Sequence, residues 1–404
     1  MKNKLIKLTT LSIVATSLAY AGGYRIPEIS INSVALSSAN IANSKGADAS
    51  YYNPANMSFM NDQQAAEFNL MYVGLDPTNF SGSMSSTDST PVDIDSESET
   101  FLIPSLHYVS NEYDGFRYGF SLVVPGGLTK RWNDSPAVDY AEEFSLTVIE
   151  LNPSVSYKVD ETLALAFGLR ALHSEGIVKS SSTASRSLEG DSWDFGYNLA
   201  LSYKPTNDLD VALTYRSNVD LTEEGNAKLY IGDAKVYDGG ASVTVPMPAV
   251  IDLAFAYTLP TKTTIEFVYE RTFWSSYEDL DFEYKDSIPV LLQAPMDNAI
   301  PKDWEDTNTY RLGVTQKLEN YSLMAGIVYD ETPVPENRVS YELPDSDSVA
   351  VSFGGRYAID EKLDIGMSML YSIRDDRDIN NNEIKGTFSN SNITLVSFGA
   401  GYKF

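Results

Sequence analysis

The sequence predicts an all-β chain that closes into a 14-stranded antiparallel transmembrane β-barrel. From about Ala66 to Phe404, stretches of alternating apolar and polar residues are joined by six very short connectors and seven long ones, in strict succession. Many of the 26 tyrosines stand near the ends of these stretches, where the interfacial region of a bilayer favours aromatic side chains. Short turns at one end and long loops at the other are typical of an up-and-down barrel in a membrane.

The alternation is clearest between Trp193 and Tyr203, where the large apolar residues share one face and the small or polar residues share the other. Similar stretches recur along the chain. In chain order, the expected strands are Ala66–Leu75, Leu102–Tyr108, Phe116–Val124, Ile149–Tyr157, Leu163–Ala171, Trp193–Tyr203, Leu209–Tyr215, Ile251–Leu259, Ile265–Phe273, Tyr310–Gln316, Tyr321–Tyr329, Val349–Tyr357, Leu363–Tyr371 and Val396–Phe404.

The short connectors carry residues that favour turns, such as Asn111–Gly115 and Pro205–Asp208. An even number of strands places both ends of the barrel on one side, so the short turns are expected to face the periplasm and the long connectors the outside. The long connectors, including those near Ser174–Gly190 and Thr222–Val245, are polar and read as loops. A soluble β-sandwich would also alternate, but the high strand count and the aromatic strand ends favour the barrel.

The first 21 residues are expected to be a signal peptide. Lys2, Lys4 and Lys7 give a positive start, Leu8–Leu18 is a short apolar run, and Ala19–Ala21 fits a cleavage site before Gly22. An uncleaved anchor is the alternative. No later segment reaches 18 consecutive apolar residues, so a membrane assignment depends on strands that close into a barrel.

Composition excludes several classes of function. The chain has 56 acidic against 29 basic residues and a net charge of −27, which is unfavourable for nucleic-acid binding. It has no cysteine and two histidines, which excludes thiolate chemistry and Cys-based metal sites; we expect no metal and no cofactor. No G-x-S-x-G motif is present, so no enzyme is expected, although His107 has the phase of a residue that faces the barrel interior.

Residues 22–62 differ from residues 63–404. They are rich in small residues and lack period-2 alternation, which suits a compact plug packed inside the barrel. Asn53-Pro54-Ala55 is typical of a turn or a helix start. At the other end of the chain, Phe404 follows alternating apolar residues, as does the terminal strand that the outer-membrane assembly machinery recognises in such barrels.

Several segments, taken in order, resemble the FadL-type family of long-chain fatty acid and aromatic hydrocarbon transporters of the bacterial outer membrane. The N-terminal segments Gly22–Glu28 and Ala47–Ala55 resemble the family's hatch. Others in the barrel resemble it as well. They are Val124–Thr129, Asn152–Lys158, Trp304–Thr307 and Tyr329–Pro335.

The resemblance implies a barrel plugged by its own N-terminus, a monomer that takes up hydrophobic small molecules passively by lateral diffusion through its wall. It places Gly22, Gly23 and Tyr24 at the ligand and gate. Asn53, Pro54 and Ala55 shape the hatch, and Val124, Pro125, Gly126 and Gly127 form a kink beside a lateral opening. Pro125 lacks a donor for the ladder, and the two glycines permit a bend.

Arg117 and Arg170 have lumen-facing phases and are candidates to bind a ligand carboxylate, although inward charges in barrels often pair with lumen acids. The expected partners are a hydrophobic ligand, outer-membrane lipid and lipopolysaccharide, and the assembly machinery. A general diffusion porin for polar solutes is the alternative function; it would have an open lumen.

Overall fold

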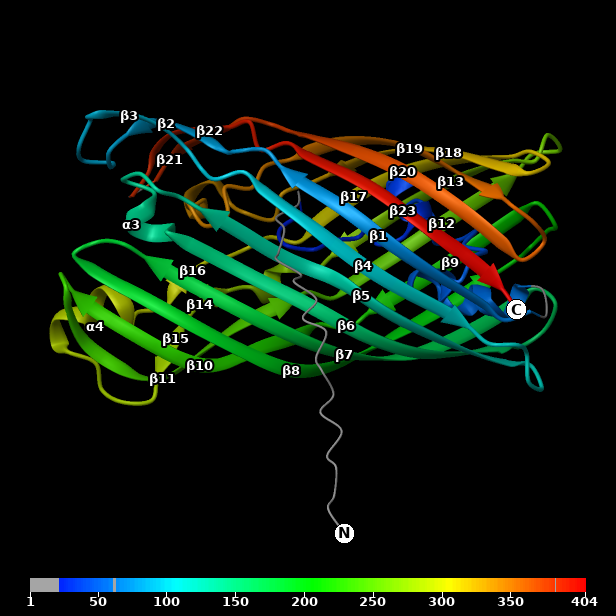
Figure 1. Cartoon of the computed structure of the whole chain (residues 1–404), viewed down its shortest axis with the longest axis horizontal. Coiled ribbons are helices and arrows are strands. Elements are labelled where there is room, and N and C mark those ends of the chain that lie inside the picture. Colours follow the sequence, from blue (N-terminus) through cyan, green and yellow to red (C-terminus); the bar gives the residue numbers. More distant parts are fainter. Residues whose placement is uncertain (1–21, 61–62, 382) are drawn as a thin grey trace, which may run out of the picture.

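The computed structural model describes residues 22–60, 63–381 and 383–404, and these form a closed 14-stranded antiparallel barrel (Figure 1). Each wall strand pairs with the next along the chain, and the last pairs with the first, from Ala65 against Lys403 to Leu75 against Ile393. The wall strands are β1 (Ala65–Leu75), β4 (Glu99–Val109), β5 (Phe116–Arg131), β6 (Glu143–Lys158), β7 (Leu163–Ser180), β8 (Ala184–Tyr203), β9 (Leu209–Arg216), β12 (Val250–Thr258), β13 (Thr263–Thr272), β17 (Thr307–Lys317), β18 (Tyr321–Asp330), β19 (Ser348–Ala358), β20 (Leu363–Arg374) and β23 (Ile393–Lys403).

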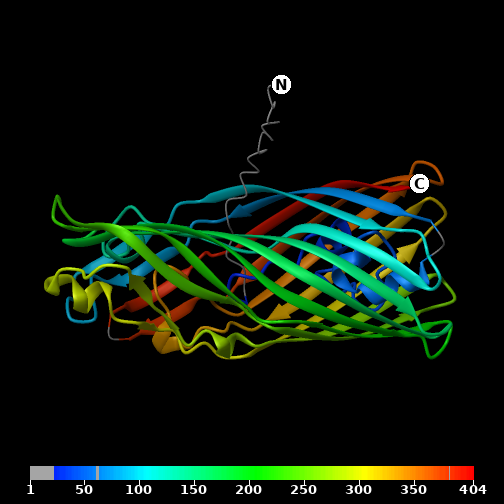
Figure 2. The same ribbon diagram turned by 90° about the horizontal axis from the view of Figure 1, so that it is seen from below.

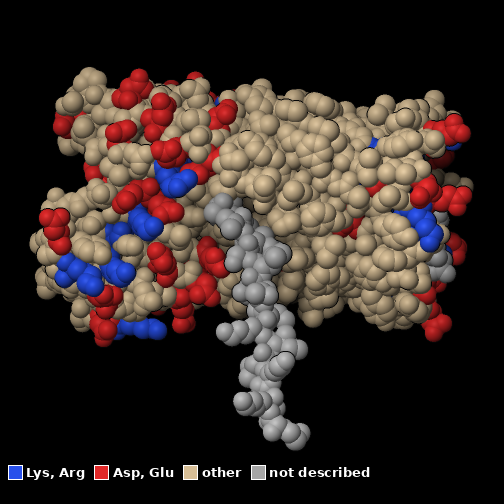
Figure 3. All heavy atoms as spheres, in the orientation of Figure 1, with Lys and Arg blue, Asp and Glu red and all other residues tan. Residues whose placement is uncertain are grey.

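The outer surface of the barrel carries an apolar belt. Large apolar side chains point outward on every wall strand, and Phe195 is 73% exposed although it is one of the most apolar residue types. On the face shown in Figure 3, acidic and basic residues gather at the two ends and leave an uncharged band between them. Such a band meets the hydrocarbon of a membrane. The C-terminal residue Phe404 is also exposed, at the end of β23.

The N-terminal segment 22–60, called the hatch below, packs inside the barrel (Figure 2). Its helices α1 (Ile31–Ala35) and α2 (Ala49–Tyr52) and its 3-10 helix η1 (Pro54–Phe59) are almost wholly buried. The proposed cleavage site and signal peptide lie outside the described residues. Helices are short throughout the described chain, and none has the length and apolar character that a membrane crossing requires.

The strands do not stop at the outer edge of the belt. β7 and β8 continue beyond it, and β10 (Val219–Ile231) with β11 (Ala234–Met247) extends β9 and β12 into one long hairpin. The expectation of loops near Ser174–Gly190 and Thr222–Val245 is therefore wrong. The outward faces of these strand extensions are polar because they meet water rather than lipid. The pattern of apolar outward and polar inward residues that marks a membrane strand is therefore absent from them.

The remaining elements close the outer end of the barrel around a large apolar cluster. One group forms a four-stranded sheet, and the others are short strands and helices from the connectors. The sheet contains β2 (Asn79–Ser83), β3 (Pro91–Asp95), β21 (Arg377–Asn380) and β22 (Lys385–Ser389); the others are α3 (Val138–Ala141), η2 (Trp274–Ser276), β14 (Asp279–Leu280), β15 (Phe282–Tyr284), α4 (Val290–Met296), β16 (Ile300–Pro301) and η3 (Glu336–Arg338).

Candidate functional site

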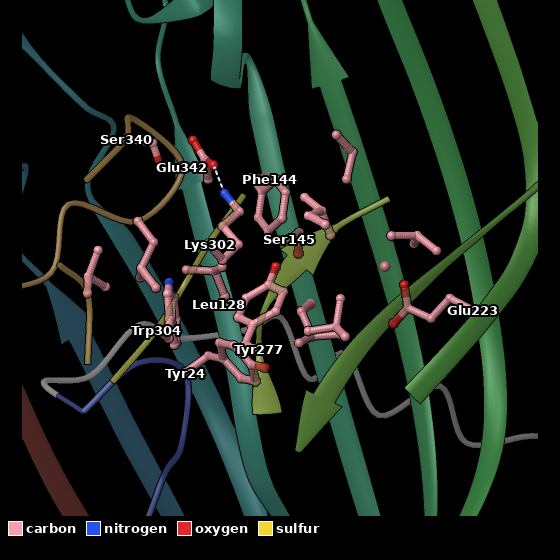
Figure 4. A pocket seen from close by; sticks show the side chains of 18 of the residues that line it. Tyr24, Leu128, Phe144, Ser145, Glu223, Tyr277, Lys302, Trp304, Ser340 and Glu342 are labelled. Carbon is pink, nitrogen blue, oxygen red and sulfur yellow. Dashed lines mark hydrogen bonds and ion pairs between the residues drawn. The ribbon is translucent and has the colours of Figure 1, made fainter. Parts of the chain in front are cut away.

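A largely apolar cavity lies in the outer part of the barrel, above the hatch. It encloses roughly 600 Å³ of empty space, some of it continuous with solvent, which is within the usual size of a small-molecule site. Figure 4 shows Tyr24 from the hatch and Tyr277 and Trp304 from the connector after β13 facing into it. The other apolar lining residues are Leu128, Phe144, Leu146, Val178, Val243, Val245, Leu280, Val334 and Leu343.

Tyr24 lies at the centre of an aromatic cluster at the floor of this cavity. Its ring meets Trp274 edge-on at 4.8 Å between centroids and lies 5.7 Å from Trp304. Its hydroxyl donates to the backbone carbonyl of Pro246 in β11, and its side chain is 2% exposed. The hatch therefore contributes an aromatic side chain to the wall of the cavity.

The two glycines before Tyr24 allow the chain to approach that cluster. Gly22 and Gly23 have φ of +80° and +76°, a region that favours glycine. A Cβ on Gly23 would lie 2.6 Å from the Trp274 ring, and one on Gly22 would lie 2.8 Å from an Asp330 oxygen. The Gly23 amide donates to Asp345 at 3.3 Å, which ties the start of the described hatch to the connector between β18 and β19.

Charged groups gather at one side of the cavity. Lys302, which is 5% exposed, pairs with Glu342, and Arg338 donates to Asp303 at 2.8 Å. Burial raises the pKa of the Glu342 carboxyl, but the charge and hydrogen bond of Lys302, together with hydrogen bonds from Ser340 and the backbone, leave that pKa below its ordinary value. This side of the cavity can hold the polar end of an amphipathic molecule.

The barrel wall is interrupted between β4 and β5. Their ladder covers Leu106–Val109 of β4 and Gly119–Leu122 of β5. Beyond it the β5–β6 register shifts between Val123 and Gly126, which is where Val124 and Pro125 lie. The two strands meet again further out, where Arg131 donates to Glu99 at 2.7 and 2.6 Å. Between these points no ladder joins β4 and β5 in the described part of the chain.

The hatch occupies the edge of β5 that β4 leaves. Gly127 donates from its amide to the Tyr24 carbonyl at 2.8 Å, and Ile26 donates to the Pro125 carbonyl at 2.8 Å. Because β6 remains paired with β5 at Gly126, these bonds must lie on the opposite edge. A Cβ on Gly126 would come within 3.3 Å of the Tyr24 carbonyl and within 2.8 Å of the flexible end of Met247, so the hatch and β5 lie close together here.

Buried ion pairs hold the hatch to the wall. Arg25 lies 2.6 Å from Glu270 of β13, and Arg311 of β17 lies 3.2 Å from Glu28 and 3.4 Å from Glu270. Glu266 accepts from the backbone amides of Ile41 and Ala42, both at 2.6 Å. A second cavity of roughly 590 Å³ lies beside these groups, and its lining is much more polar than that of the first.

The hatch motif has a structural place. Asn53 caps η1 by accepting from the Ala55 amide at 3.1 Å, and its amide donates to Ile41 within the hatch and to Ser202 of β8. Pro54 is the first residue of η1, where its missing donor costs nothing. The motif therefore shapes the hatch and fastens it to the barrel.

The two arginine candidates lie apart from the apolar cavity. Arg170 donates to Glu150 at 2.9 Å with both side chains buried, and Arg216 shares that carboxylate at 3.0 Å. Arg170 lines the second, polar cavity. Arg117 donates to the Met60 carbonyl at 3.0 Å, at the end of the described hatch. Their lumen-facing phase is confirmed, but the cations at the apolar cavity are Lys302 and Arg338.

His107 also faces the interior. Its Nδ1 lies 3.0 Å from the Ser121 hydroxyl, which lies 2.8 Å from that of Ser50 in the hatch. The pair is buried between wall and hatch, where it fastens one to the other.

The sequence matches, over residues 12–404, the family described as outer membrane protein transport protein (OMPP1/FadL/TodX). The chain belongs to this family. It is 24% identical over 407 residues to the long-chain fatty acid transport protein of Salmonella typhi, covering 89% of this chain and 90% of that protein. The family is one of transport channels rather than enzymes, and it places the chain in the outer membrane.

Solved structures show the same fold. A Pseudomonas aeruginosa FadL homologue superimposes with a TM-score of 0.84 at 19% identity, covering 94% of this chain and 99% of that one. The Pseudomonas putida toluene transporter TodX gives a TM-score of 0.71 at 19% identity, with 92% and 98% covered. The 14-stranded barrel with an internal N-terminal segment is thus confirmed.

Tyr24, which the resemblance placed at the ligand, lines the apolar cavity, but the sequence did not indicate most of the other lining residues. Trp304 and Val334 lie in segments that resemble the family, yet their role as lining residues was not inferred. Leu146, Val243 and Tyr277 come from strand extensions and a connector that read as loop, and only the closed fold brings them together.

Proposed function

We propose that this protein carries hydrophobic small molecules passively from the outside into the outer membrane by lateral diffusion through its wall. The cargo class is that of the relatives' names, long-chain fatty acids or aromatic hydrocarbons. A ligand enters the apolar cavity, where its apolar surface leaves water and packs against the rings of Tyr24, Tyr277 and Trp304. A carboxylate on the ligand would lie toward Lys302 and Arg338.

The exit is the interruption between β4 and β5. The hatch segment Tyr24–Ile26 stands in the place of a wall strand there, held by two backbone hydrogen bonds rather than a full ladder. Movement of this segment would join the cavity to the lipid beside Val124–Gly127. The cargo then need not cross water, and the transfer of its apolar surface into water would be unfavourable.

One observation carries the proposal: Tyr24 lines the apolar cavity with its ring, and its backbone carbonyl accepts from Gly127 on the free edge of β5. A ligand that displaces Tyr24 must therefore also disturb the cover over the interruption. This favours coupling between binding and opening. The porin alternative predicted an open lumen, whereas the hatch occupies the lumen of this barrel.

The test is to restore regular pairing along β5. In the triple variant Pro125→Val, Gly126→Thr, Gly127→Val, backbone donors and β-favouring side chains replace the kink. We expect ligand binding to persist, because most of the cavity wall is unchanged, while uptake falls by about tenfold or more, equivalent to about 1.4 kcal/mol in the barrier. Uptake would be measured in cells with radiolabelled oleate, and binding by quenching of tryptophan fluorescence.

The matched control is Pro153→Val, which removes an exposed proline from the outward face of β6, opposite Phe120 of β5. It should leave both uptake and binding at the wild-type level. Heat-modifiable mobility on gels would show that each variant folds. Wild-type uptake by the folded triple variant would refute the lateral route, and a large steady ion conductance of the wild type in planar bilayers would favour the porin.

A further inference from the structure

Glu223 is a buried carboxyl group at the border of two hollows. It lies on β10 with 4% of its surface exposed, on the side of the apolar cavity across from the Lys302–Glu342 pair, and it points toward that cavity (Figure 4). It also lines a smaller hollow of roughly 280 Å³ between β7, β8, β10 and β11. A molecule that lies in either hollow meets this carboxyl group.

One oxygen of this carboxyl group is unused. Ser174 hydrogen-bonds to the Glu223 carboxyl, but Oε1 has no partner among the residues that the structure describes. An unpaired buried polar atom in a native protein is costly, typically by about 1–3 kcal/mol. Its side chain nevertheless lines a largely apolar cavity together with Val178 and Val243, where an aliphatic residue would satisfy packing.

The neighbouring strand leaves room for the group. The Glu223 Oε2 occupies the space where a Cβ on Gly176 of β7 would be, at a separation of only 1.8 Å. Gly176 therefore allows the carboxyl group to reach the cavity, and any larger residue would push it aside. Position, orientation and the missing partner together describe a hydrogen-bonding subsite.

We propose that Glu223 accepts a hydrogen bond from a hydroxyl group of the ligand, so that the site favours hydroxylated hydrophobic compounds over their pure hydrocarbon counterparts. This rests on the proposed function, since it names the ligand class of the same cavity. The apolar lining holds the carbon skeleton, and Oε1 selects for the hydroxyl. A site that holds a buried acceptor disfavours an analogue that lacks the donor, because the acceptor then stays unpaired.

The experiment compares toluene with 4-methylphenol, which differ by one oxygen. Binding to the full chain in detergent is measured by isothermal titration calorimetry. We expect the wild type to bind 4-methylphenol about tenfold more tightly than toluene, beyond the ratio set by micelle partitioning, which corresponds to one hydrogen bond of about 1.4 kcal/mol. Glu223→Leu should abolish that preference and strengthen toluene binding.

Two further variants sharpen the result. Glu224→Leu makes the same chemical change on the adjacent exposed residue of β10 and should keep the wild-type preference. Partitioning of the two compounds into the detergent micelle is the same for all variants, so this control also accounts for it. Gly176→Ala keeps the carboxyl group but displaces its flexible end, so it should lose the preference without unfolding the barrel.

The outcomes separate two failures. Equal preference in wild type and folded Glu223→Leu would overturn the subsite while leaving transport through the cavity intact. If neither compound bound to the wild type while oleate did, the subsite would be wrong and the cavity function would stand; if oleate also failed to bind, both would be wrong. A preference that disappears in Glu223→Leu and Gly176→Ala, and persists in Glu224→Leu, supports the subsite.

Discussion

The lumen of this barrel has two regions of opposite polarity, although the same strands build both. At the level of the apolar belt, inward residues of β6 are polar: Glu150, Asn152 and Ser154 are buried in the interior. Further out on the same strand, the inward residues are Leu146 and Val148. One region binds its own N-terminus through hydrogen bonds and ion pairs, and the other leaves an apolar cavity for a foreign molecule.

The difference shows how one barrel can be both closed and receptive. The polar region is occupied from within the chain, because the hatch provides partners for Glu266, Glu270 and Arg311. The apolar region has no such internal occupant across its whole volume, and a ligand that buries carbon there gains about 25 cal/mol per Å². Stability should therefore depend on the lower region and affinity on the upper one.

The largest effect is expected from the polar region. Replacing Glu270 by Leu removes the shared partner of Arg25 and Arg311 and leaves two guanidinium groups buried without it. Breaking a buried ion pair in this way typically costs about 3–5 kcal/mol. We expect a corresponding fall in the free energy of unfolding, measured by denaturant titration in detergent, with a smaller change in ligand affinity.

The matched control is Glu161→Leu, which removes the partner of Lys158 in an exposed turn and should change stability little. If Glu270→Leu were as stable as Glu161→Leu, the ion pairs between hatch and wall would not stabilise the fold. If it lost affinity in proportion to stability, the two regions would not be separable.

The effect next in size is a pH dependence in the apolar region. Burial raises the pKa of Glu223 to about 8; the hydrogen bond with Ser174 opposes this, and the nearby acids Asp194, Asp191 and Glu175 add to it. The folded chain thus holds a proton that the unfolded chain releases above about pH 4.5. This group's contribution to stability is full below about pH 4.5 and is lost as pH rises through about 8.

We expect Glu223→Gln, which stays neutral, to gain stability relative to the wild type across this window, by about 1–3 kcal/mol at its alkaline end. Thermal unfolding in detergent at acidic, neutral and alkaline pH measures it. Glu224→Gln is the control, because that side chain is exposed. A constant difference between Glu223→Gln and the wild type at all pH values would contradict the burial of a charged group here.

The sequence reveals the polar region of the lumen better than the apolar one, because the pattern of a strand depends on whether lipid or water lies outside it. Within the belt, lipid forces every outward residue to be apolar, so the alternation of Trp193–Tyr203 is visible and the inward phase of Arg170 follows from it. Above the belt, water meets the outside, so Thr222 and Glu224 alternate with inward residues in the opposite sense. The pattern of the β10–β11 hairpin therefore predicted a polar loop instead of strands.

The kink and the cavity differ for a related reason. Pro125, Gly126 and Gly127 carry their own conformational signal, so local reasoning could place an irregularity there. The cavity is assembled from Tyr24, Leu146, Val243 and Trp304, which are separated by up to hundreds of residues, and only closure of the barrel brings them together. Arg117 and Arg170 face the lumen as their phase indicates. Pairing of such a cation with a lumen acid such as Glu150, or with the plug, was the alternative to ligand binding; Glu150 pairs with Arg170, and the Met60 carbonyl of the hatch accepts from Arg117.

The smallest expected effect tests the contrast on a single strand. Leu146→Asn puts an amide into the apolar cavity and should weaken oleate binding by about tenfold, since one buried aliphatic side chain contributes about 1.5–3 kcal/mol of which part is retained. Its counterpart Asn152→Leu removes the partner of the Leu169 carbonyl and of Asn198, at 2.8 Å each, six residues along β6. It should lower stability and leave affinity unchanged.

Fluorescence quenching of Trp274 and Trp304 measures affinity for both variants. Because the two changes are opposite in polarity and share one strand, a general loosening of β6 would affect both measurements alike. Separate effects on stability and on affinity are expected only if one region of the lumen binds the hatch and another binds the ligand.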